Sequence, residues 1–259
     1  MNEAPAIQTQ QLTKVYGSGN TEVVALHDAT LTVRRGEVAA LLGPSGAGKT
    51  TLLTAVGLIN PPTSGQIIIG GKPVMDGPYP LTSLSAFRRK HIGYVFQQSN
   101  LIPFLTACEN VQIAMELDGW GRRAARRRAM ELLSYLDVDD RADFYPAALS
   151  GGQQQRVGIA RTLMQEPKLI LADEPVASLD PVLAHTILRY LELLNKEGIT
   201  VICSLHFLDL VHRYATRVIG LKDGIKIFEG LPQEIDRARF KEIYGEEAQE
   251  VRATTVEEA

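Results

Sequence analysis

The feature that most constrains this chain is a glycine-rich loop between an apolar run and a helical pattern. The loop, GPSGAGKTT, follows the apolar run EVAALL and leads into TTLLTAVGL. Glycines let the backbone curl so that successive N–H groups converge on phosphate oxygens, and the N-terminus of the next helix adds about half a positive charge. This order predicts a phosphate-binding loop made of Gly43, Pro44, Ser45, Gly46, Ala47, Gly48, Lys49, Thr50 and Thr51.

A second apolar run ends in two acidic residues. In LILADE, Asp173 and Glu174 follow four apolar residues that are typical of a buried strand. Lys49 is expected to reach the β- and γ-phosphates, while Thr50 and Asp173 hold Mg²⁺, Asp173 through water. Glu174 is placed to polarise a water for attack on the γ-phosphate. These two motifs predict a P-loop NTPase and leave kinases, GTPases and motor ATPases open.

The distribution of apolar residues predicts an α/β fold. Short apolar runs bounded by turn residues are typical of buried parallel strands, and they occupy residues 37–43, 91–97, 168–174 and 199–206. Helical patterns lie between them, which favours α/β layering. The opening segments IQTQQLTKVY and VVALHDATLTV alternate apolar and polar residues, which predicts antiparallel strands at a β-rich edge.

These patterns predict one domain over residues 1–246. Its α/β core, with the β edge, is expected to span residues 1–98 and 162–230. A helical lobe is expected as an insertion at about 99–161, because that stretch has few β-branched runs. Residues 247–259 are acidic and poor in large apolar side chains, so a frayed polar tail is expected there.

Composition narrows the possible partners. The chain has 259 residues, 27 of them basic and 30 acidic, and its net charge of −3 gives no global positive field for nucleic acid or an anionic membrane. No stretch approaches the roughly 20 apolar residues that a membrane span needs, so any span is expected to come from a partner. Cys108 and Cys203 lack a C-x-x-C spacing, which favours a reduced, cytoplasmic setting.

The sequence LSGGQ, some 20 residues before LILADE, resembles the signature sequence of ATP-binding-cassette ATPases. The resemblance also includes VFQQ with Gln97, SLD at residues 178–180 and the strand-terminal His206. Together with the phosphate loop and LILADE, these motifs stand in the order of that family and cover nearly the whole chain. The resemblance implies the architecture of the family: a P-loop core, an antiparallel β edge subdomain and an inserted helical subdomain.

The resemblance further implies a dimer. In this family two cassettes pack head to tail around two ATP molecules, and the signature of one covers the γ-phosphate bound by the other. The residues assigned that role here are Ser150, Gly151, Gly152 and Gln153. Their place at the start of a helix suits a second phosphate-binding nest, although a plain Ser-capped helix would have the same residues. The expected partner is a second copy of this chain.

Four further residues receive roles from the resemblance. Gln97 would contact the metal or the attacking water and relay movement to the helical lobe; an amide at a strand end can also simply satisfy backbone groups. His206 would bind the γ-phosphate and pair with Glu174. Asp180 would contact the phosphate loop of the opposite cassette. Tyr16 would stack on adenine, with a core tyrosine as the alternative.

Two regions resemble different transporters. Residues 84–111 resemble the cassettes of lipoprotein-releasing, macrolide-exporting and glycolipid-exporting systems, whereas EPVASLDP and residues 204–224 and 229–245 resemble the phosphonate-importer cassette. We give the first more weight, because in this family the residues after Gln97 receive the coupling helix of the permease. Phe104 and Leu105 are the candidate contacts, and packing within the helical lobe is the alternative.

The sequence thus predicts the ATP-hydrolysing subunit of a membrane transporter, bound to a separate permease at the cytoplasmic face of the inner or plasma membrane. Export of lipoprotein, lipid or macrolide is the first expectation and phosphonate import the alternative. A soluble cassette acting on DNA or ribosomes is disfavoured, because the chain has no heptad runs or internal repeat. A non-hydrolysing regulatory cassette is disfavoured by the intact Lys49, Asp173, Glu174 and His206. The arginine cluster of Arg122, Arg123, Arg126, Arg127 and Arg128 is expected to form a solvated helix face, with contact to anionic lipid headgroups as the alternative.

Overall fold

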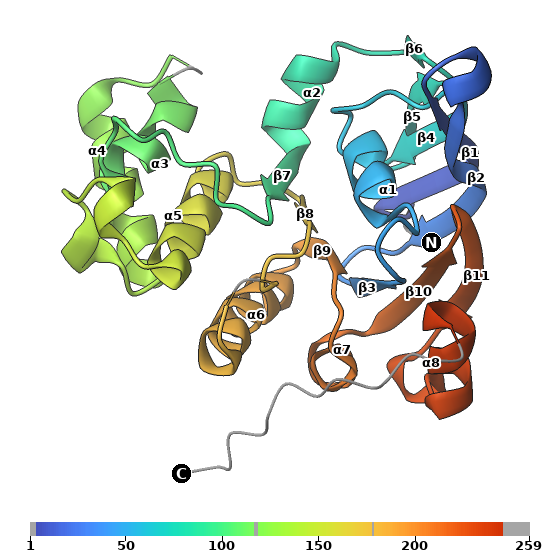
Figure 1. The fold of residues 1–259 in the computed structure, drawn as a ribbon. Helices are drawn as coiled ribbons and strands as arrows, with labels where there is room; N and C mark the ends of the chain where they lie inside the picture. Colours follow the sequence, from blue (N-terminus) through green and yellow to red (C-terminus); the bar gives the residue numbers. More distant parts are fainter. Residues whose placement is uncertain (1–3, 117–118, 178, 246–259) are drawn as a thin grey trace.

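A computed structural model describes residues 4–116, 119–177 and 179–245 (Figure 1). The first of its two sheets is antiparallel, in the order β2-β1-β4-β5-β6. Its strands are β1 (Ile7–Tyr16), β2 (Val23–Val33), β4 (Ser64–Ile69), β5 (Lys72–Asp76) and β6 (Tyr79–Pro80). The two opening segments predicted to be antiparallel strands are β1 and β2, which pair along most of their length.

The second sheet has the order β11-β10-β3-β9-β8-β7 and runs parallel from β10 to β7. The edge strand β11 pairs antiparallel with β10. Every residue of β3, β8 and β9 is buried, as expected for parallel strands covered on both faces. The four predicted apolar strands are therefore confirmed. The strands are β3 (Val38–Leu42), β7 (Ile92–Val95), β8 (Leu169–Ala172), β9 (Thr200–Ser204), β10 (Arg217–Lys222) and β11 (Ile225–Gly230).

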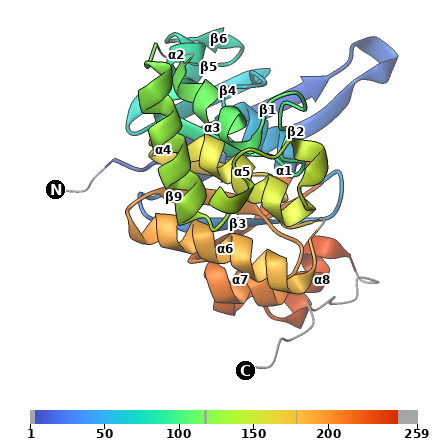
Figure 2. The same ribbon diagram turned by 90° about the vertical axis from the view of Figure 1, so that its left-hand side faces the viewer.

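Helices surround the second sheet and also form a separate part. Three helices lie together at one side of Figure 1 and stand in front of the strands in Figure 2; we call them the helical part. They are α3 (Ala107–Glu116), α4 (Arg122–Tyr135) and α5 (Gly151–Leu163). The other helices are α1 (Lys49–Val56), α2 (Leu84–His91), α6 (Pro181–Lys196), α7 (Leu208–Tyr214) and α8 (Arg237–Tyr244). Short 3-10 turns are η1 (Gly19–Thr21), η2 (Asp139–Arg141), η3 (Pro146–Ala148) and η4 (Pro232–Glu234).

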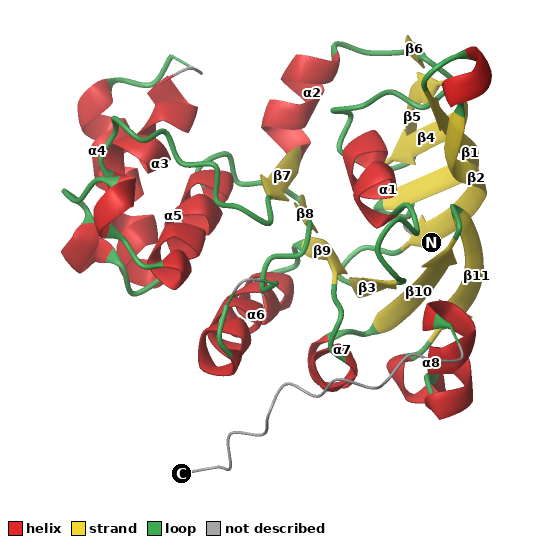
Figure 3. Ribbon diagram, viewed as in Figure 1, coloured by secondary structure: helices red, strands yellow, loops and turns green. Residues whose placement is uncertain are grey.

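Apolar packing forms two clusters, one on each face of the second sheet. Helix α1 packs Leu52, Leu53 and Val56 into the cluster shared by both sheets. The other cluster joins the helical part and α6 to the opposite face. In Figure 3 the strands accordingly form a continuous region with helices on either side. This layering matches the predicted α/β class.

The helical part is fixed to the sheet next to β7. The Thr162 hydroxyl donates to the Tyr94 carbonyl at 3.1 Å, and the Gln155 amide donates to the Phe96 carbonyl at 3.0 Å. Gly93 allows α5 to lie this close, because a Cβ atom there would fall 2.3 Å from the Thr162 methyl carbon. The close approach of the Thr162 side chain to the main chain of β7 therefore depends on a residue without a side chain.

The arginine cluster lies on α4 and faces solvent. Its members form exposed ion pairs, such as Arg126 with Asp143 at 3.2 Å and Arg128 with Glu131 at 3.1 Å. Exposed pairs of this kind contribute little to stability. The side chains are thus exposed, as expected, while the choice of a solvated face over lipid contact stays a prediction.

The remaining predictions about the fold concern the two cysteines, the C-terminal tail, the domain limits and a membrane span. Cys108 and Cys203 are both buried and unpaired. Ser178 and the predicted tail at residues 247–259 lie outside the described residues. The exact domain limits stay a prediction. Within the described residues, none of the helices combines the length and apolar character needed to cross a membrane.

Two glycines that contact the same junction are expected to respond in opposite ways to alanine. Gly93→Ala should lower the free energy of unfolding by about 1–3 kcal/mol, because the added methyl overlaps Thr162. Gly158→Ala should raise it by about 0.5–1 kcal/mol, because Gly158 lies inside α5, where alanine is the better helix former. The added Cβ would make only an ordinary 3.5 Å contact with Ser99. Urea denaturation of both variants checks the pair, and equal destabilisation would contradict the packing described here.

Candidate functional site

The predicted phosphate loop joins β3 to α1. Gly43, Gly46 and Gly48 have φ values of +151°, +82° and +97°, in the region that favours glycine. A Cβ on Gly43 would lie 2.3 Å from the Leu221 carbonyl oxygen, and one on Gly48 would lie 2.6 Å from the Ala25 carbonyl oxygen. The conformation of the loop therefore requires glycine at these positions, and α1 begins with its N–H groups at the end of the loop.

Lys49 is held across the loop. Its side chain is buried, and Nζ donates to the Gly43 carbonyl at 2.7 Å and the Pro44 carbonyl at 3.0 Å. Burial lowers the pKa of Lys49, while the negative charges of Glu174 and Asp173 oppose that shift. A buried cation therefore sits among backbone oxygens with two carboxylates nearby.

Asp173 lies between the phosphate loop and β9. Its Oδ1 atom accepts hydrogen bonds from the Thr50 hydroxyl at 3.2 Å and the Ser204 hydroxyl at 3.1 Å. Burial nevertheless raises the pKa of Asp173, and these hydrogen bonds oppose the shift. The structure thus brings together Thr50 and Asp173, two of the three predicted metal ligands.

Ser204 was not singled out from the sequence. Its hydroxyl also accepts a hydrogen bond from the Glu174 backbone N–H at 2.7 Å, so one buried side chain contacts both acidic residues. The parallel register pairs Ala172 with Cys203, which sets Ser204 beside Asp173. The available signal was its place at the end of an apolar run, two residues before His206.

Glu174 and His206 form a close pair. His206 Nε2 lies 2.7 Å from Glu174 Oε1, and both side chains are partly exposed. Glu174 has a φ of +47°, an uncommon conformation for a residue with a side chain. The Ser204 bond to the Glu174 N–H supports that backbone. The predicted pairing of these two residues is present, with both groups following the carboxyl ends of neighbouring strands.

Gln97, the third predicted metal ligand, lines a neighbouring hollow. Its side chain is exposed and lines an open hollow of about 470 Å³ together with Gly151, Gln155 and Pro175. Among the described residues no hydrogen bond joins Gln97 to Thr50 or Asp173. The hollow lies between the helical part and the segment after Glu174, so Gln97 stands where these two regions meet.

The signature residues begin α5. The Ser150 hydroxyl accepts from the Gln153 N–H at 3.3 Å, while Gln153 Oε1 accepts from the Ser150 N–H at 2.9 Å, which forms a capping box. Ser150 and Gly151 are exposed. Gly152 is buried against the Leu183 side chain, and a Cβ there would lie 2.9 Å from it. Thus the helix cap is real, and its outer two residues remain accessible.

Asp180 and Tyr16, the last two residues given roles by the resemblance, lie at the start of α6 and the end of β1. Asp180 caps α6 by accepting from the Leu183 N–H at 3.0 Å, and it is exposed. Tyr16 ends β1 with 40% of its surface exposed, which excludes the core position considered as an alternative. The Lys14 ammonium lies 5.1 Å from the centre of the Tyr16 ring. The ring is therefore open to a stacking partner.

The donor set around Asp173 fits a hard cation. A carboxylate and the hydroxyls of Thr50 and Ser204 offer oxygen atoms, the ligands that Mg²⁺ prefers. In the described part of the chain no group of three or more His, Cys, Asp or Glu could enclose a metal. A cation here would need further oxygens from a bound phosphate, as is usual for Mg²⁺ with nucleotides.

Comparisons with known proteins identify relatives over most of the chain. Residues 26–177 match the family model described as ABC transporter. The chain is 42% identical over 256 residues to the phosphonates import ATP-binding protein PhnC of Bdellovibrio bacteriovorus, which covers 95% of this chain and 96% of the relative. It is 40% identical over 220 residues to the lipoprotein-releasing system ATP-binding protein LolD 1 of Rhodospirillum rubrum, covering 85% of this chain and 96% of that protein.

A solved structure gives the same result. The dimeric structure of a post-hydrolysis state of the ATP-binding cassette MJ0796, bound to ADP and Pi, matches with a TM-score of 0.80 and 36% identity. The match covers 87% of this chain and 98% of that chain. Fold and sequence both agree with these relatives. This chain belongs to the ABC transporter family, as an ATP-binding cassette that hydrolyses ATP.

Proposed function

We propose that this chain couples ATP-driven closure of a cassette dimer to the movement of a separate membrane permease. The observation that carries the proposal is the division of the site. Lys49, Asp173, Glu174 and His206 gather around the phosphate loop, whereas Ser150 is exposed at the start of α5 in the helical part. A complete site would then require the signature of a second subunit.

The residues around the loop would have separate roles. The loop N–H groups and Lys49 would bind the phosphates of ATP, and Tyr16 would stack on the adenine. Glu174 would accept a proton from the attacking water, with His206 orienting its carboxylate and contacting the γ-phosphate. Stabilisation of charge on the transferring phosphoryl group would provide most of the rate enhancement.

Mg²⁺ is the proposed metal. Thr50 and Asp173 would hold it, with Gln97 recruited from the neighbouring hollow when the helical part approaches. A bound Mg²⁺ would neutralise charge that develops on the phosphate oxygens. Its positive charge would also favour the ionised form of Asp173, which burial disfavours.

The proposed dimer is head to tail and made of two copies of this chain. The N-terminus of α5, where Ser150 and Gly151 are exposed and Gly152 and Gln153 follow, would receive the γ-phosphate held by the partner. Asp180, which is exposed at the start of α6, would contact the partner's phosphate loop. The solved cassette that this chain resembles is dimeric, which supports a dimer.

The proposed permease contact lies on the loop before α3. Phe104 has 76% of its surface exposed, while Leu105 is half-buried, so Phe104 is the stronger candidate of the predicted pair. A large apolar ring this exposed is suited to burial against a partner. We propose no direct membrane span and no nucleic-acid contact; the chain would sit at the cytoplasmic face of the inner or plasma membrane through its permease.

We propose export of a lipoprotein, lipid or macrolide as the transport type, because the resemblance to export cassettes lies in residues 84–111, around the proposed permease contact. The LolD relative supports this type. Phosphonate import is the second candidate, favoured by a relative that covers 95% of the chain, including the C-terminal region. Identification of the co-purifying membrane protein decides between them. A permease with a large periplasmic domain would indicate export, and a compact permease with a binding protein would indicate uptake.

Asp173→Asn should stabilise the nucleotide-free chain near pH 8. Burial places the folded-state pKa of Asp173 above its unfolded value, so the wild type loses stability as pH rises through that folded pKa. Asp173→Asn has no charge to bury and so avoids this loss. Its greater stability relative to wild type should therefore shrink as pH falls toward about 4. Melting temperatures of both proteins across this range check the sign. A variant less stable than wild type near pH 8 would mean that Lys49 outweighs the effect of burial.

Glu174→Gln should lower ATP turnover at least about a hundredfold, because the proposed base is lost while the side chain keeps its shape. ATP should then accumulate in a stable dimer, seen by size-exclusion chromatography. The matched control is Glu174→Gln combined with Ser150→Arg, which should remain monomeric because the arginine blocks the signature surface. Near-normal phosphate release by Glu174→Gln would remove Glu174 from this role, and dimers of the double variant would contradict the head-to-tail arrangement.

Phe104→Ala should weaken permease binding about tenfold, as expected for loss of a central aromatic contact. The measurement uses the co-purified permease reconstituted in lipid vesicles with increasing amounts of cassette, following stimulated ATP turnover. Tyr79→Ala is the matched control, because Tyr79 is a similarly exposed aromatic residue, at 73%, on β6. Equal effects of the two variants would contradict the proposed contact surface.

A further inference from the structure

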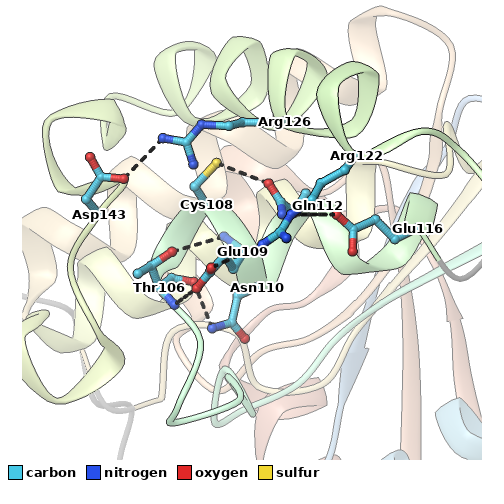
Figure 4. A network of polar contacts seen from close by, with 9 residues as sticks. All are labelled: Thr106, Cys108, Glu109, Asn110, Gln112, Glu116, Arg122, Arg126 and Asp143. Carbon is cyan, nitrogen blue, oxygen red and sulfur yellow. Dashed lines mark hydrogen bonds and ion pairs between the residues drawn. The ribbon is translucent and has the colours of Figure 1, made fainter.

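Asn110 binds the backbone of the loop that carries Phe104. Its side chain is completely buried within the helical part. Oδ1 accepts from the Ile102 N–H at 2.7 Å, and Nδ2 donates to the carbonyls of Ile102, Leu105 and Thr106, each at 3.0 Å. One amide group therefore satisfies both backbone polar groups of Ile102 and closes the loop onto α3. Figure 4 shows Asn110 beside Thr106 at the end of this loop, with the hydrogen bond between them.

The end of the same loop is fixed by a capping box. The Thr106 N–H donates to Glu109 Oε2 at 2.9 Å, and the Glu109 N–H donates to the Thr106 hydroxyl at 3.3 Å. The hydrogen bond from the Thr106 backbone is the main reason that the pKa of Glu109 is lowered. Both ends of the loop are therefore held, and Phe104 projects between them.

A second set of bonds leads from α3 toward the signature. The first two N–H groups of α3 donate to the carbonyls of Phe144 and Ala142, each at 2.8 Å. Arg126 of α4 forms an ion pair with Asp143 in the same segment, as Figure 4 shows. This segment continues through η3 directly to Ser150. Thus the start of α3 touches both the Phe104 loop and the segment that precedes the signature.

We propose that Asn110 is the positioning residue of the permease contact: it holds Phe104 in a fixed place relative to α3 and so to the signature. The proposal rests on the proposed function, in which Phe104 meets the permease. An amide is needed because the site requires one acceptor for the Ile102 N–H and, at once, N–H donors, of which Nδ2 has two to share among three carbonyls. A carboxylate of the same shape would lose the donors and face three carbonyl oxygens, and a smaller side chain would leave buried backbone groups unpaired.

The first experiment measures the loop itself. In Asn110→Asp, amide hydrogen exchange over residues 102–106 should rise by at least about tenfold in the full chain, because the bonds that close the loop are lost. Asn195→Asp is the matched control: Asn195 also donates to two backbone carbonyls, those of Gly36 and Ile199, but from α6. In Asn195→Asp, amide hydrogen exchange over residues 102–106 should stay at the wild-type level. If Asn110→Asp does not fold, the neutral Asn110→Ser gives the same comparison without a buried charge.

The second experiment measures coupling to Phe104. With the reconstituted permease, Asn110→Asp alone should weaken binding about tenfold, comparable with Phe104→Ala. In a Phe104→Ala background the same change should add little further loss, because Asn110 acts through Phe104. A residue that only stabilised the fold would weaken binding by the same factor in either background.

The outcomes separate this inference from the proposed function. Unchanged permease binding by Phe104→Ala would overturn the proposed contact surface and, with it, the role of Asn110 in positioning that contact. Unchanged loop exchange in the Asn110 variants, or independent and multiplying effects of Asn110→Asp and Phe104→Ala, would overturn the positioning role while the contact surface stands. Increased loop exchange together with non-multiplying effects would support it.

Discussion

The parallel pairing of β3, β9 and β8 is the constraint on which the candidate site depends. Carboxyl ends of parallel strands meet at one edge, where ligands of α/β proteins bind. Here that edge collects the phosphate loop after β3, the two acidic residues after β8 and His206 after β9. Since side chains alternate along a strand, a slip of one residue between β8 and β9 would turn Ser204 away from Asp173. The sheet register is thus a requirement of the chemistry.

This edge holds buried charged groups, Lys49 and Asp173, whose burial the rest of the chain compensates only in part. Burial lowers the pKa of Lys49 and raises that of Asp173, so both ionised groups are costly to bury. Glu174 adds an uncommon backbone conformation beside them. Phosphate oxygens would offset the first cost and a cation the second. Binding of a nucleotide with its metal would therefore also stabilise the fold, since a ligand that binds only the folded state shifts the unfolding equilibrium.

Sequence reasoning reached the residues that are local to a motif. The glycine loop, Asp173 and Glu174 could be predicted because each follows a recognisable apolar strand, whereas the role of His206 came from the resemblance to the cassette family. Ser204 could not, because its contacts depend on the register between two strands far apart in sequence. The different exposure of Phe104 and its neighbour Leu105 was equally inaccessible, since it depends on how the loop folds against α3, where Asn110 bonds to the Leu105 carbonyl.

The helical part carries two surfaces with different partners, and its internal bonds determine whether they move together. Phe104 would meet the permease, and Ser150 would meet the nucleotide of the second subunit. Bonds from the start of α3 reach the segment before Ser150, whereas α5 is anchored to the sheet beside β7, through Tyr94 and Phe96. Gln97 follows these anchors directly and lines the hollow between the two regions. A change in the angle between helical part and sheet would therefore alter the surroundings of Gln97 first, while the distance between Phe104 and Ser150 would be preserved.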